Sequence, residues 1–340
     1  MAPNPLRSDP TRTQTLRRQF ETEVRKRLKL LKRAIYKLIV EEDAFGLAVK
    51  PLLATNTRWQ FITDEAKLEA FKAWLLLKLQ EGLLEARQPT GDVWTAIWIR
   101  KAYERGLGRA FDEVRKPGLA AQSNFYQGTK AEFLRSSFQR PASVERIKLL
   151  AARTFTDLDG ISKDIETKLS RVLVDGFING DNPRTIARQI DSEIDTIGRK
   201  RALTLARTEV IRAHAEGAID GMEALGVEEI GVAVEWSTAE DSIVCPLCRP
   251  LDGIILSIEE AHGMFPRHPN CRCSPIPANV GEADRKQTKK TKARIKTAID
   301  KSIAAEIPKK SKRSVATQRS RSSWVGAGKA IRKQRPKSIL

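Results

Sequence analysis

The chain is poor in histidine, cysteine and aromatic residues, and it has no long apolar run. Of its 340 residues, 3 are His, 4 are Cys and 6% are aromatic. No window approaches the roughly 18 uninterrupted apolar residues that a membrane-spanning helix needs, so we expect no membrane partner. The segment from Met1 to Pro10 lacks the apolar core of a signal peptide, so we expect a protein that is made and used in a cytosol.

Acidic residues are scarce at one end of the chain. Residues 281–340 carry 19 Lys or Arg against 4 Asp or Glu, a net charge of +15, whereas the whole chain has 61 against 42, a net charge of +19. The first 280 residues therefore hold 42 against 38, a net charge of only +4. We expect a basic and largely disordered tail, with a helix possible over 285–305, that attracts polyanions without reading their sequence.

The first 230 residues have the apolar periodicity of long amphipathic helices, so the fold class is predicted to be mainly α. A second helix is predicted from about Asp64, with Leu68, Phe71, Trp74, Leu75 and Leu79 on its buried side, and Trp94, Ile97 and Trp98 mark a third. The tryptophans are interpreted as core residues. The first helix carries one apolar stripe, formed by Leu16, Phe20, Val24, Leu28, Leu31, Ile35 and Leu38.

Helix stop and start signals divide this helical region. Pro117-Gly118 is a breaker, and Thr129 with Glu132 fits a capping box that opens a new helix. That helix ends at Gln139-Arg140-Pro141, so we place a boundary there and predict a helical docking domain over 1–140. The pattern resumes from Ser143 to about Phe177, and Asn182 with Pro183 begins the next helix.

A helix from about Arg199 to Leu225 carries two glycines, Gly217 and Gly221, on its apolar face. Each glycine costs roughly 1 kcal/mol of helix propensity against alanine, so we expect another backbone to pack tightly there. Arg207, Glu209 and Arg212 lie close together on the same helix. An ion-pair network is the favoured interpretation of these three, over a catalytic pair.

After Gly226, which supplies the helix stop, the pattern changes to that of a small α+β module. Val232–Trp236 is predicted to be a strand, and Asp252-Gly253 a turn into a second strand at Ile254–Leu256. Ser257 with Glu260 predicts a capped single turn of helix. Four prolines then predict an extended exit, namely Pro266, Pro269, Pro275 and Pro277.

All four cysteines fall in one 29-residue stretch of this module. They form a C-x2-C pair, followed by H-x2-C-x-C. In a C-x2-C turn both sulfurs face one centre, and zinc takes four such ligands in a tetrahedron. Clustered free thiols, two disulfides and a catalytic Cys–His pair are the alternatives. Five side chains compete for four places: Cys245, Cys248 and Cys271 are favoured, and His268 and Cys273 contest the last.

A closed structural zinc (Zn2+) site is favoured over a catalytic one. The sequence has no H-E-x-x-H, and the only other histidines are His214, interpreted as a partly buried helix residue, and His262, interpreted as a surface residue of a short helix. A module of about 50 residues is small for an independent core. Zinc would supply on the order of 10 kcal/mol toward its folding.

Taken in order, several short stretches resemble the phage Mu F-like minor head protein family, also called the head morphogenesis family. These stretches are Ala206–Glu209, Trp236, Cys245–Cys248, Leu251–Gly253 and His268–Cys273, and the resemblance spans about residues 145–277. It implies a head morphogenesis domain over 141–280 with its Cys/His module at 232–277. The metal candidacy of the Cys and His positions carries over, whereas Arg207 and Glu209 carry over as motif positions without an agreed role.

The resemblance further implies a virion component, in the head interior near the portal, that joins the procapsid during assembly in the host cytoplasm. Portal, capsid and scaffold proteins are the implied partners, and no catalytic activity is implied. With the +15 tail of 281–340, we expect non-specific contact with packaged double-stranded DNA. The basic residues predicted to make it are Lys289, Lys290, Lys292, Arg294, Lys309, Lys310, Lys312, Arg313, Arg319, Arg321, Lys333 and Arg335.

Two other functions remain open from the sequence. One is an enzyme, a zinc-containing nuclease or a toxin-like effector delivered with the DNA, for which His214 and His262 would have to supply acid and base groups. The other is a host zinc-ribbon regulator, which fits the basic tail but not the long helical body. A nuclease assay separates the first from an assembly protein, and sequence-specific DNA binding would favour the second.

Overall fold

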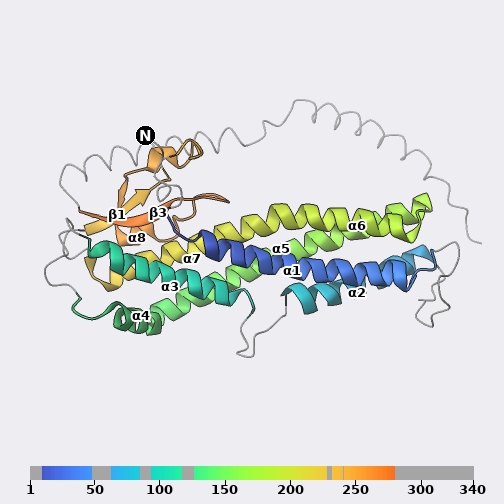
Figure 1. The fold of residues 1–340 in the computed structure, drawn as a ribbon, viewed down its shortest axis with the longest axis horizontal. Coiled ribbons are helices and arrows are strands. Elements are labelled where there is room, and N and C mark those ends of the chain that lie inside the picture. Colours follow the sequence, from blue (N-terminus) through green and yellow to red (C-terminus); the bar gives the residue numbers. More distant parts are fainter. Residues whose placement is uncertain are drawn as a thin grey trace, which may run out of the picture. The chain divides into compact units, whose positions relative to one another are not determined.

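Helices make up most of the part of the chain that the structure, a computed structural model, describes (Figure 1). The described residues are 10–47, 63–84, 93–116, 126–227, 232–239 and 241–279. The basic tail over 281–340 with its predicted DNA-contacting side chains, the helix considered over 285–305 and the breaker at Pro117-Gly118 lie outside them. The mainly α class with a small C-terminal sheet is confirmed for the described part.

The first two helices follow the predicted apolar stripes. Helix α1 (Gln14–Tyr36) buries its whole stripe and continues into a π-type turn (Lys37–Glu41) that buries Leu38. Helix α2 (Asp64–Leu79) begins at Thr63, whose hydroxyl accepts the N–H of Ala66. It buries Phe71, Leu75 and Leu79 but leaves Leu68 and Trp74 only half-buried, which corrects the predicted buried face.

The third helix, α3 (Ala96–Val114), starts just after a buried tryptophan. The Trp94 ring is buried and its Nε1 donates to the carbonyl of Leu83 at 2.8 Å, which supports the predicted core role. Trp98 is half-buried and stacks on Phe20 of α1, with ring centroids 5.9 Å apart. Ile97 is exposed, so the aromatic residues rather than Ile97 anchor this end of α3.

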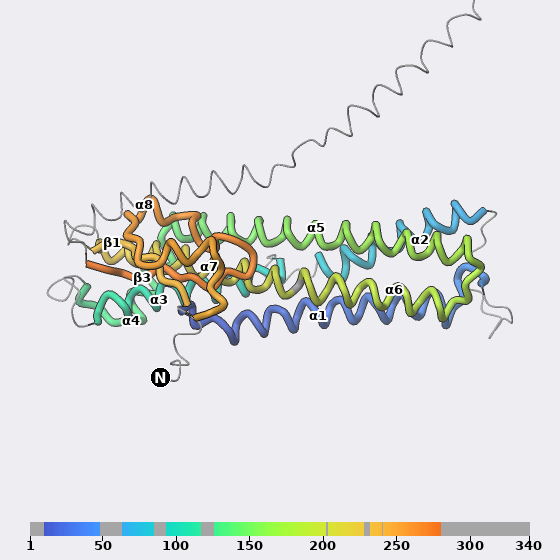
Figure 2. The backbone as a smooth tube through the Cα atoms, turned by 90° about the horizontal axis from the view of Figure 1, so that it is seen from above, coloured from blue at the N-terminus to red at the C-terminus, as the bar shows by residue number. Residues whose placement is uncertain are grey.

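Local signals set the bounds of the next helices. The predicted capping box of Thr129 and Glu132 opens α4 (Lys130–Gln139), and α5 (Pro141–Asn179) follows with Pro141 in its first turn. Helix α6 (Pro183–Ile197) begins at the predicted N-cap Asn182. A π-type turn (Gly198–Ala202) joins it to α7 (Leu203–Ala224), so the predicted single helix from Arg199 has a distorted start. Figures 1 and 2 show α1, α2, α5 and α6 running alongside one another.

Helices α3 and α7 pack backbone to backbone through glycines. A Cβ on Gly217 would lie 2.2 Å from the carbonyl oxygen of Tyr103, and one on Gly106 would lie 2.1 Å from that of His214. The predicted close approach at Gly217 is therefore confirmed. This contact joins a helix before residue 140 to one after it within one compact unit. The boundary predicted near residue 140 therefore remains a prediction about the different roles of the two parts of the chain.

The C-terminal module is a three-stranded antiparallel sheet with two short helical turns, a 3-10 turn (Arg249–Leu251) and α8 (Ile258–Ala261). Strand β1 (Val232–Ser237) lies between β2 (Ile255–Leu256) and β3 (Ser274–Asn279), and α8 has the predicted capping box of Ser257 and Glu260. Its core contains Trp236 stacked on Phe265, with ring centroids 4.0 Å apart. The strand β3 was predicted only as an extended exit.

The prolines of β3 fit the sheet because they occupy positions whose N–H groups would point away from β1. Pro275 lies opposite Trp236, and Pro277 lies opposite Val234. Trp236 uses both its N–H and its carbonyl on the β2 side, with Ile254 and Gly253 at 2.8 Å each. Since Trp236 makes no main-chain bond toward β3, the missing N–H of Pro275 leaves no gap in the ladder.

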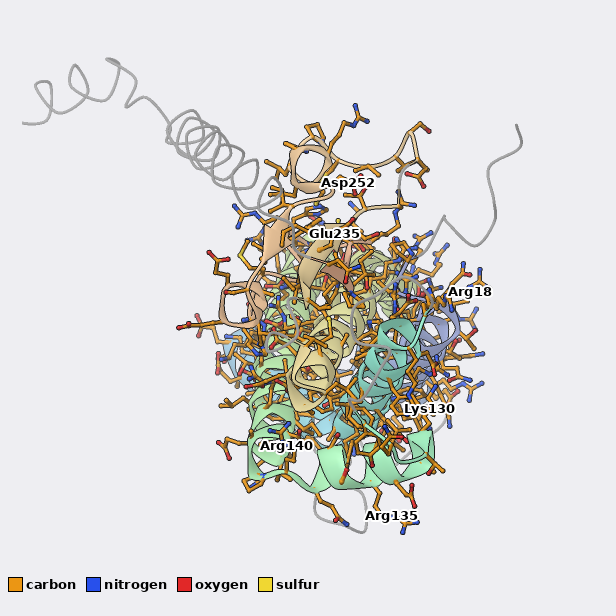
Figure 3. All side chains as sticks on the ribbon, turned by 90° about the vertical axis from the view of Figure 1, so that its left-hand side faces the viewer. Arg18, Lys130, Arg135, Arg140, Glu235 and Asp252 are labelled. Carbon is orange, nitrogen blue, oxygen red and sulfur yellow. The ribbon has the colours of Figure 1, made fainter. Side chains whose placement is uncertain are left out.

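The module and α4 lie on different sides of the helices. Figure 3 shows Glu235 and Asp252 in the module, on one side of the helices, and Arg135 and Arg140 beside α4 on the other. Among the described residues, none of the helices combines the length and the apolar character needed to cross a lipid bilayer.

Candidate metal centre and its surroundings

The C-x2-C turn has the geometry of a metal-binding knuckle. The N–H of Cys248 points at the sulfur of Cys245, at 3.3 Å, and also bonds to the carbonyl of Cys245, at 3.1 Å. Cys245 is half-buried and Cys248 is buried. The turn therefore presents both sulfurs to the same side.

The second group of predicted ligands comes to the same place from the loop before β3. The Nε2 atom of His268 lies 2.9 Å from the Cys245 sulfur and 3.2 Å from that of Cys248, and the Cys248 and Cys271 sulfurs are 3.7 Å apart. Two triads result, which share Cys248: one with Cys245 and His268, the other with Cys271 and Cys273. All five predicted candidates therefore converge.

The proton positions suit metal binding. The Nδ1 atom of His268 lies 2.8 Å from the carbonyl of Pro269, which can only accept, so Nδ1 carries the proton and Nε2 offers its lone pair to the cysteines. Hydrogen bonds from the thiols of Cys248 and Cys273 lower the pKa of Cys271 well below its ordinary value. The thiolate, which is the form that binds metal, is therefore favoured at Cys271.

Two of the cysteine sulfurs have the spacing of zinc ligands. Two sulfurs each about 2.3 Å from a tetrahedral zinc lie roughly 3.8 Å apart, close to the 3.7 Å between Cys248 and Cys271. An imidazole nitrogen with a lone pair completes a set of soft and borderline ligands that zinc prefers. The cluster is thus compatible with a zinc site, which would tie the knuckle to the loop before β3.

Polar contacts hold the two ligand segments in place. Arg272 forms a bidentate pair with Asp241, at 2.6 and 2.7 Å, which ties the loop before β3 to the loop before the knuckle and lowers the pKa of Asp241. Asn270, in the left-handed region with φ 62°, donates its N–H to the hydroxyl of Thr208 on α7. The stretches Ala206–Glu209 and His268–Cys273 are therefore in direct contact.

The ion-pair network around α7 contains different residues from those predicted. Glu209 is buried and pairs through Oε1 with Arg212, at 3.4 Å, and with Arg153 of α5, at 3.6 Å. Arg207 is exposed and forms no ion pair among the residues that the structure describes, so Arg153 replaces it. Burial raises the pKa of Glu209 despite the two guanidinium groups.

The interpretation of His262 as a surface residue was wrong. Its side chain is only 21% exposed, and its Nδ1 lies 2.8 Å from Oε2 of the buried Glu216 on α7. The N–H of Gly263 donates to Glu216 as well, at 2.7 Å, and Arg146 of α5 pairs with both Glu216 and the neighbouring Asp220. This cluster fastens α8 to the helices. Sequence gave no signal for it because the partners lie over 40 residues apart.

The remaining histidine, His214, is more deeply buried than predicted. Its side chain is 2% exposed on α7, and burial lowers its pKa well below the ordinary value. It is therefore neutral, which removes it as a charged acid at neutral pH.

A family model confirms the resemblance seen in the sequence. Residues 167–276 match the family described as Phage Mu protein F like protein. This part of the chain is similar to the phage Mu F-like domain. The match begins within α5, later than the predicted start near 145, and ends within β3, so it contains all the candidate ligands. Searches of curated proteins and of solved structures gave no match.

The Mu F-like family is one of phage head morphogenesis, which points to a virion protein with capsid-related partners. Its structural character agrees with the expectation of a protein that is not an enzyme.

Proposed function

We propose that this Mu F-like protein is a minor head component that joins the procapsid near the portal and touches packaged DNA through residues 281–340. The match of 167–276 to the Mu F-like family carries the proposal. The charge distribution supports the DNA contact, because +15 of the net +19 lies in the last 60 residues. The helices of 1–140 supply the surface for portal, capsid and scaffold proteins in this proposal.

Deletion of residues 281–340 tests the two roles separately. DNA affinity should fall steeply with salt for the full chain, with a slope of about −0.9 per neutralised phosphate, and the deletion should abolish this salt-sensitive binding. The shortened chain should still be incorporated into procapsids when it is coexpressed with the portal and scaffold proteins of the same phage. If the shortened chain keeps its DNA affinity, residues 281–340 are not the DNA-binding segment. If it is no longer incorporated into procapsids, DNA contact and docking are not carried by separate parts of the chain.

We propose further that zinc is bound by Cys245, Cys248, His268 and Cys271. Supporting this set, His268 Nε2 contacts two of these sulfurs, and its Nδ1–H is fixed by a backbone carbonyl. Cys273, which is 3% exposed, then serves as a core thiol directly before β3. The zinc would be structural, stabilising the module rather than activating water.

Zinc per chain, measured by elemental analysis, distinguishes the ligand sets. Cys273→Ser should retain one zinc, whereas His268→Ala should lose it. The reverse result would establish a four-cysteine site. A nuclease assay on the zinc-loaded protein, with and without added magnesium, tests the enzymatic alternative.

A further inference from the structure

A second group of metal-ligating side chains lies where α8 meets the C-terminal half of α7. Asp220 and Glu223 stand about one turn apart on α7, and His262 directly follows the last residue of α8. One nitrogen or oxygen atom from each of the three lies within 4.8 Å of the other two. None of these residues belongs to the cysteine cluster, and the proposed assembly role does not use them.

The imidazole of His262 is held with one nitrogen free. Its Nδ1 lies 2.8 Å from Oε2 of Glu216, a carboxylate that also accepts the N–H of Gly263 and pairs with Arg146. Because a carboxylate can only accept, Nδ1 carries a proton, and the neutral ring offers its lone pair at Nε2. Metal-binding histidines generally donate their other N–H to such a group, which fixes the tautomer and the orientation of the ring.

The free nitrogen faces an oxygen that has no donor. Oδ1 of Asp220 lies 3.6 Å from Nε2 of His262, too far for a hydrogen bond, and has no hydrogen-bond partner among the residues that the structure describes. The other oxygen, Oδ2, accepts the hydroxyl of Tyr103 and lies 2.8 Å from Arg146. Two ligand atoms each about 2.1 Å from a tetrahedral zinc lie roughly 3.4 Å apart, so the gap between Nε2 and Oδ1 fits an ion that binds both.

The third side chain opens the group to solvent. Glu223 is exposed, and its carboxylate forms no hydrogen bond or ion pair within the described ranges. The side chain of His262 is 21% exposed, so an ion can enter from this side. The charges favour a cation as well, because three carboxylates, those of Glu216, Asp220 and Glu223, face one guanidinium, that of Arg146, for a net charge of −2.

We propose that His262, Asp220 and Glu223 bind a zinc ion, with water in the fourth position. One imidazole and two carboxylates suit zinc better than magnesium, which prefers oxygen ligands alone. The ion bridges α7 and α8 and so strengthens the attachment of the module to the helices. Because the site has three protein ligands and no thiolate, it holds zinc less tightly than the cysteine cluster and loses it on desalting.

Cobalt titration of the desalted, full-length chain tests this proposal. Tetrahedral Co2+ absorbs strongly in the visible range, and bonds from Co2+ to sulfur add a separate charge-transfer band, which reports any Co2+ in the cysteine cluster. The parent should show visible bands that rise without the sulfur band. Glu223→Gln and Asp220→Asn should each weaken this binding by roughly tenfold or more, at least the loss expected for a group that only orients a ligand.

The matched control is Glu65→Gln, at an exposed position in the first turn of α2, which should leave cobalt binding unchanged. Urea unfolding gives a second measurement. Added zinc should raise the midpoint of the desalted parent and of Glu65→Gln, but not that of Glu223→Gln. Since the Glu223 carboxylate has no partner in the described part of the chain, this variant should fold as the parent does.

Three results would overturn the proposal. The first is the absence of cobalt bands free of sulfur character in the parent. The second is equal cobalt affinity in the parent and in Glu223→Gln. The third is a zinc-induced rise of the urea midpoint that is the same in Glu223→Gln as in the parent, which would place the stabilising ion elsewhere.

Discussion

The crossing of α3 and α7 predicts opposite effects for two glycine-to-alanine substitutions. At Gly217 an alanine Cβ would lie 2.2 Å from the carbonyl oxygen of Tyr103 and 2.9 Å from its carbon, so the two helices must separate. Gly160, in the middle of α5, has nothing within 4 Å of the corresponding position. The same chemical change therefore meets backbone at one site and open space at the other.

The magnitudes follow from two opposing contributions. Alanine gains roughly 1 kcal/mol over glycine inside a helix, which applies to both sites. Forcing a methyl group into a closely packed contact costs about 3 kcal/mol where rigid backbone must move. We expect Gly217→Ala to lower the free energy of unfolding by about 2 kcal/mol, and Gly160→Ala to raise it by about 1 kcal/mol.

Urea unfolding followed by far-ultraviolet circular dichroism measures both variants, because the helices dominate that signal. The midpoint should move down for Gly217→Ala and up for Gly160→Ala at an unchanged slope. If Gly217→Ala is as stable as the parent, the helices are not in backbone contact there, and the account of the crossing is wrong.

Three further predictions concern the module and its attachment. Cys248→Ser, at the residue shared by both triads, should lose zinc and expose 232–277 to protease while the helical signal persists; unchanged protease resistance would contradict the structural role of the metal. Glu216→Ala should lower the free energy of unfolding by about 2 kcal/mol in urea, because it leaves the N–H of Gly263 without its acceptor and leaves Arg146 and His262 with Asp220 alone. Glu145→Ala, at an exposed site on α5, should change it by less than about 0.5 kcal/mol; equal effects would refute the attachment. Because burial raises the pKa of Glu209, the charged form disfavours folding, and the free energy of unfolding falls as the pH rises from the ordinary carboxyl range through that raised pKa. Over this range Glu209→Gln should become progressively more stable relative to the parent, and parallel stability profiles would contradict this.

Local signals in the sequence were sufficient for most of the helices and turns. The stripe from Leu16 to Leu38 and the caps at Thr129, Asn182 and Ser257 each depend on residues only a few positions apart, and the structure confirms them. The ligand candidates could be found because two short motifs contain all five. Their spacing could not choose among the five, since that depends on where the loop folds back.

Contacts between distant segments could not be predicted. The pairing of His262 with Glu216 and of Arg153 with Glu209 depends on how α5, α7 and α8 pack. The strand β3 was not predicted because prolines are rare in strands when the sequence is considered without its neighbours in the sheet. The prolines are compatible with β3 because each lies opposite a residue of β1 whose main-chain hydrogen bonds are directed toward β2, as those of Trp236 are. No N–H is therefore needed at the proline positions.

The same prolines affect how the protein behaves when many copies are crowded together. Strand β3 forms an edge of the sheet, and Pro275 and Pro277 both occupy the phase whose main chain turns away from β1. A strand from another copy that paired with this edge would need N–H donors at these two positions, and proline has none. The prolines thereby protect this edge of the sheet against the addition of further strands and growth into aggregates.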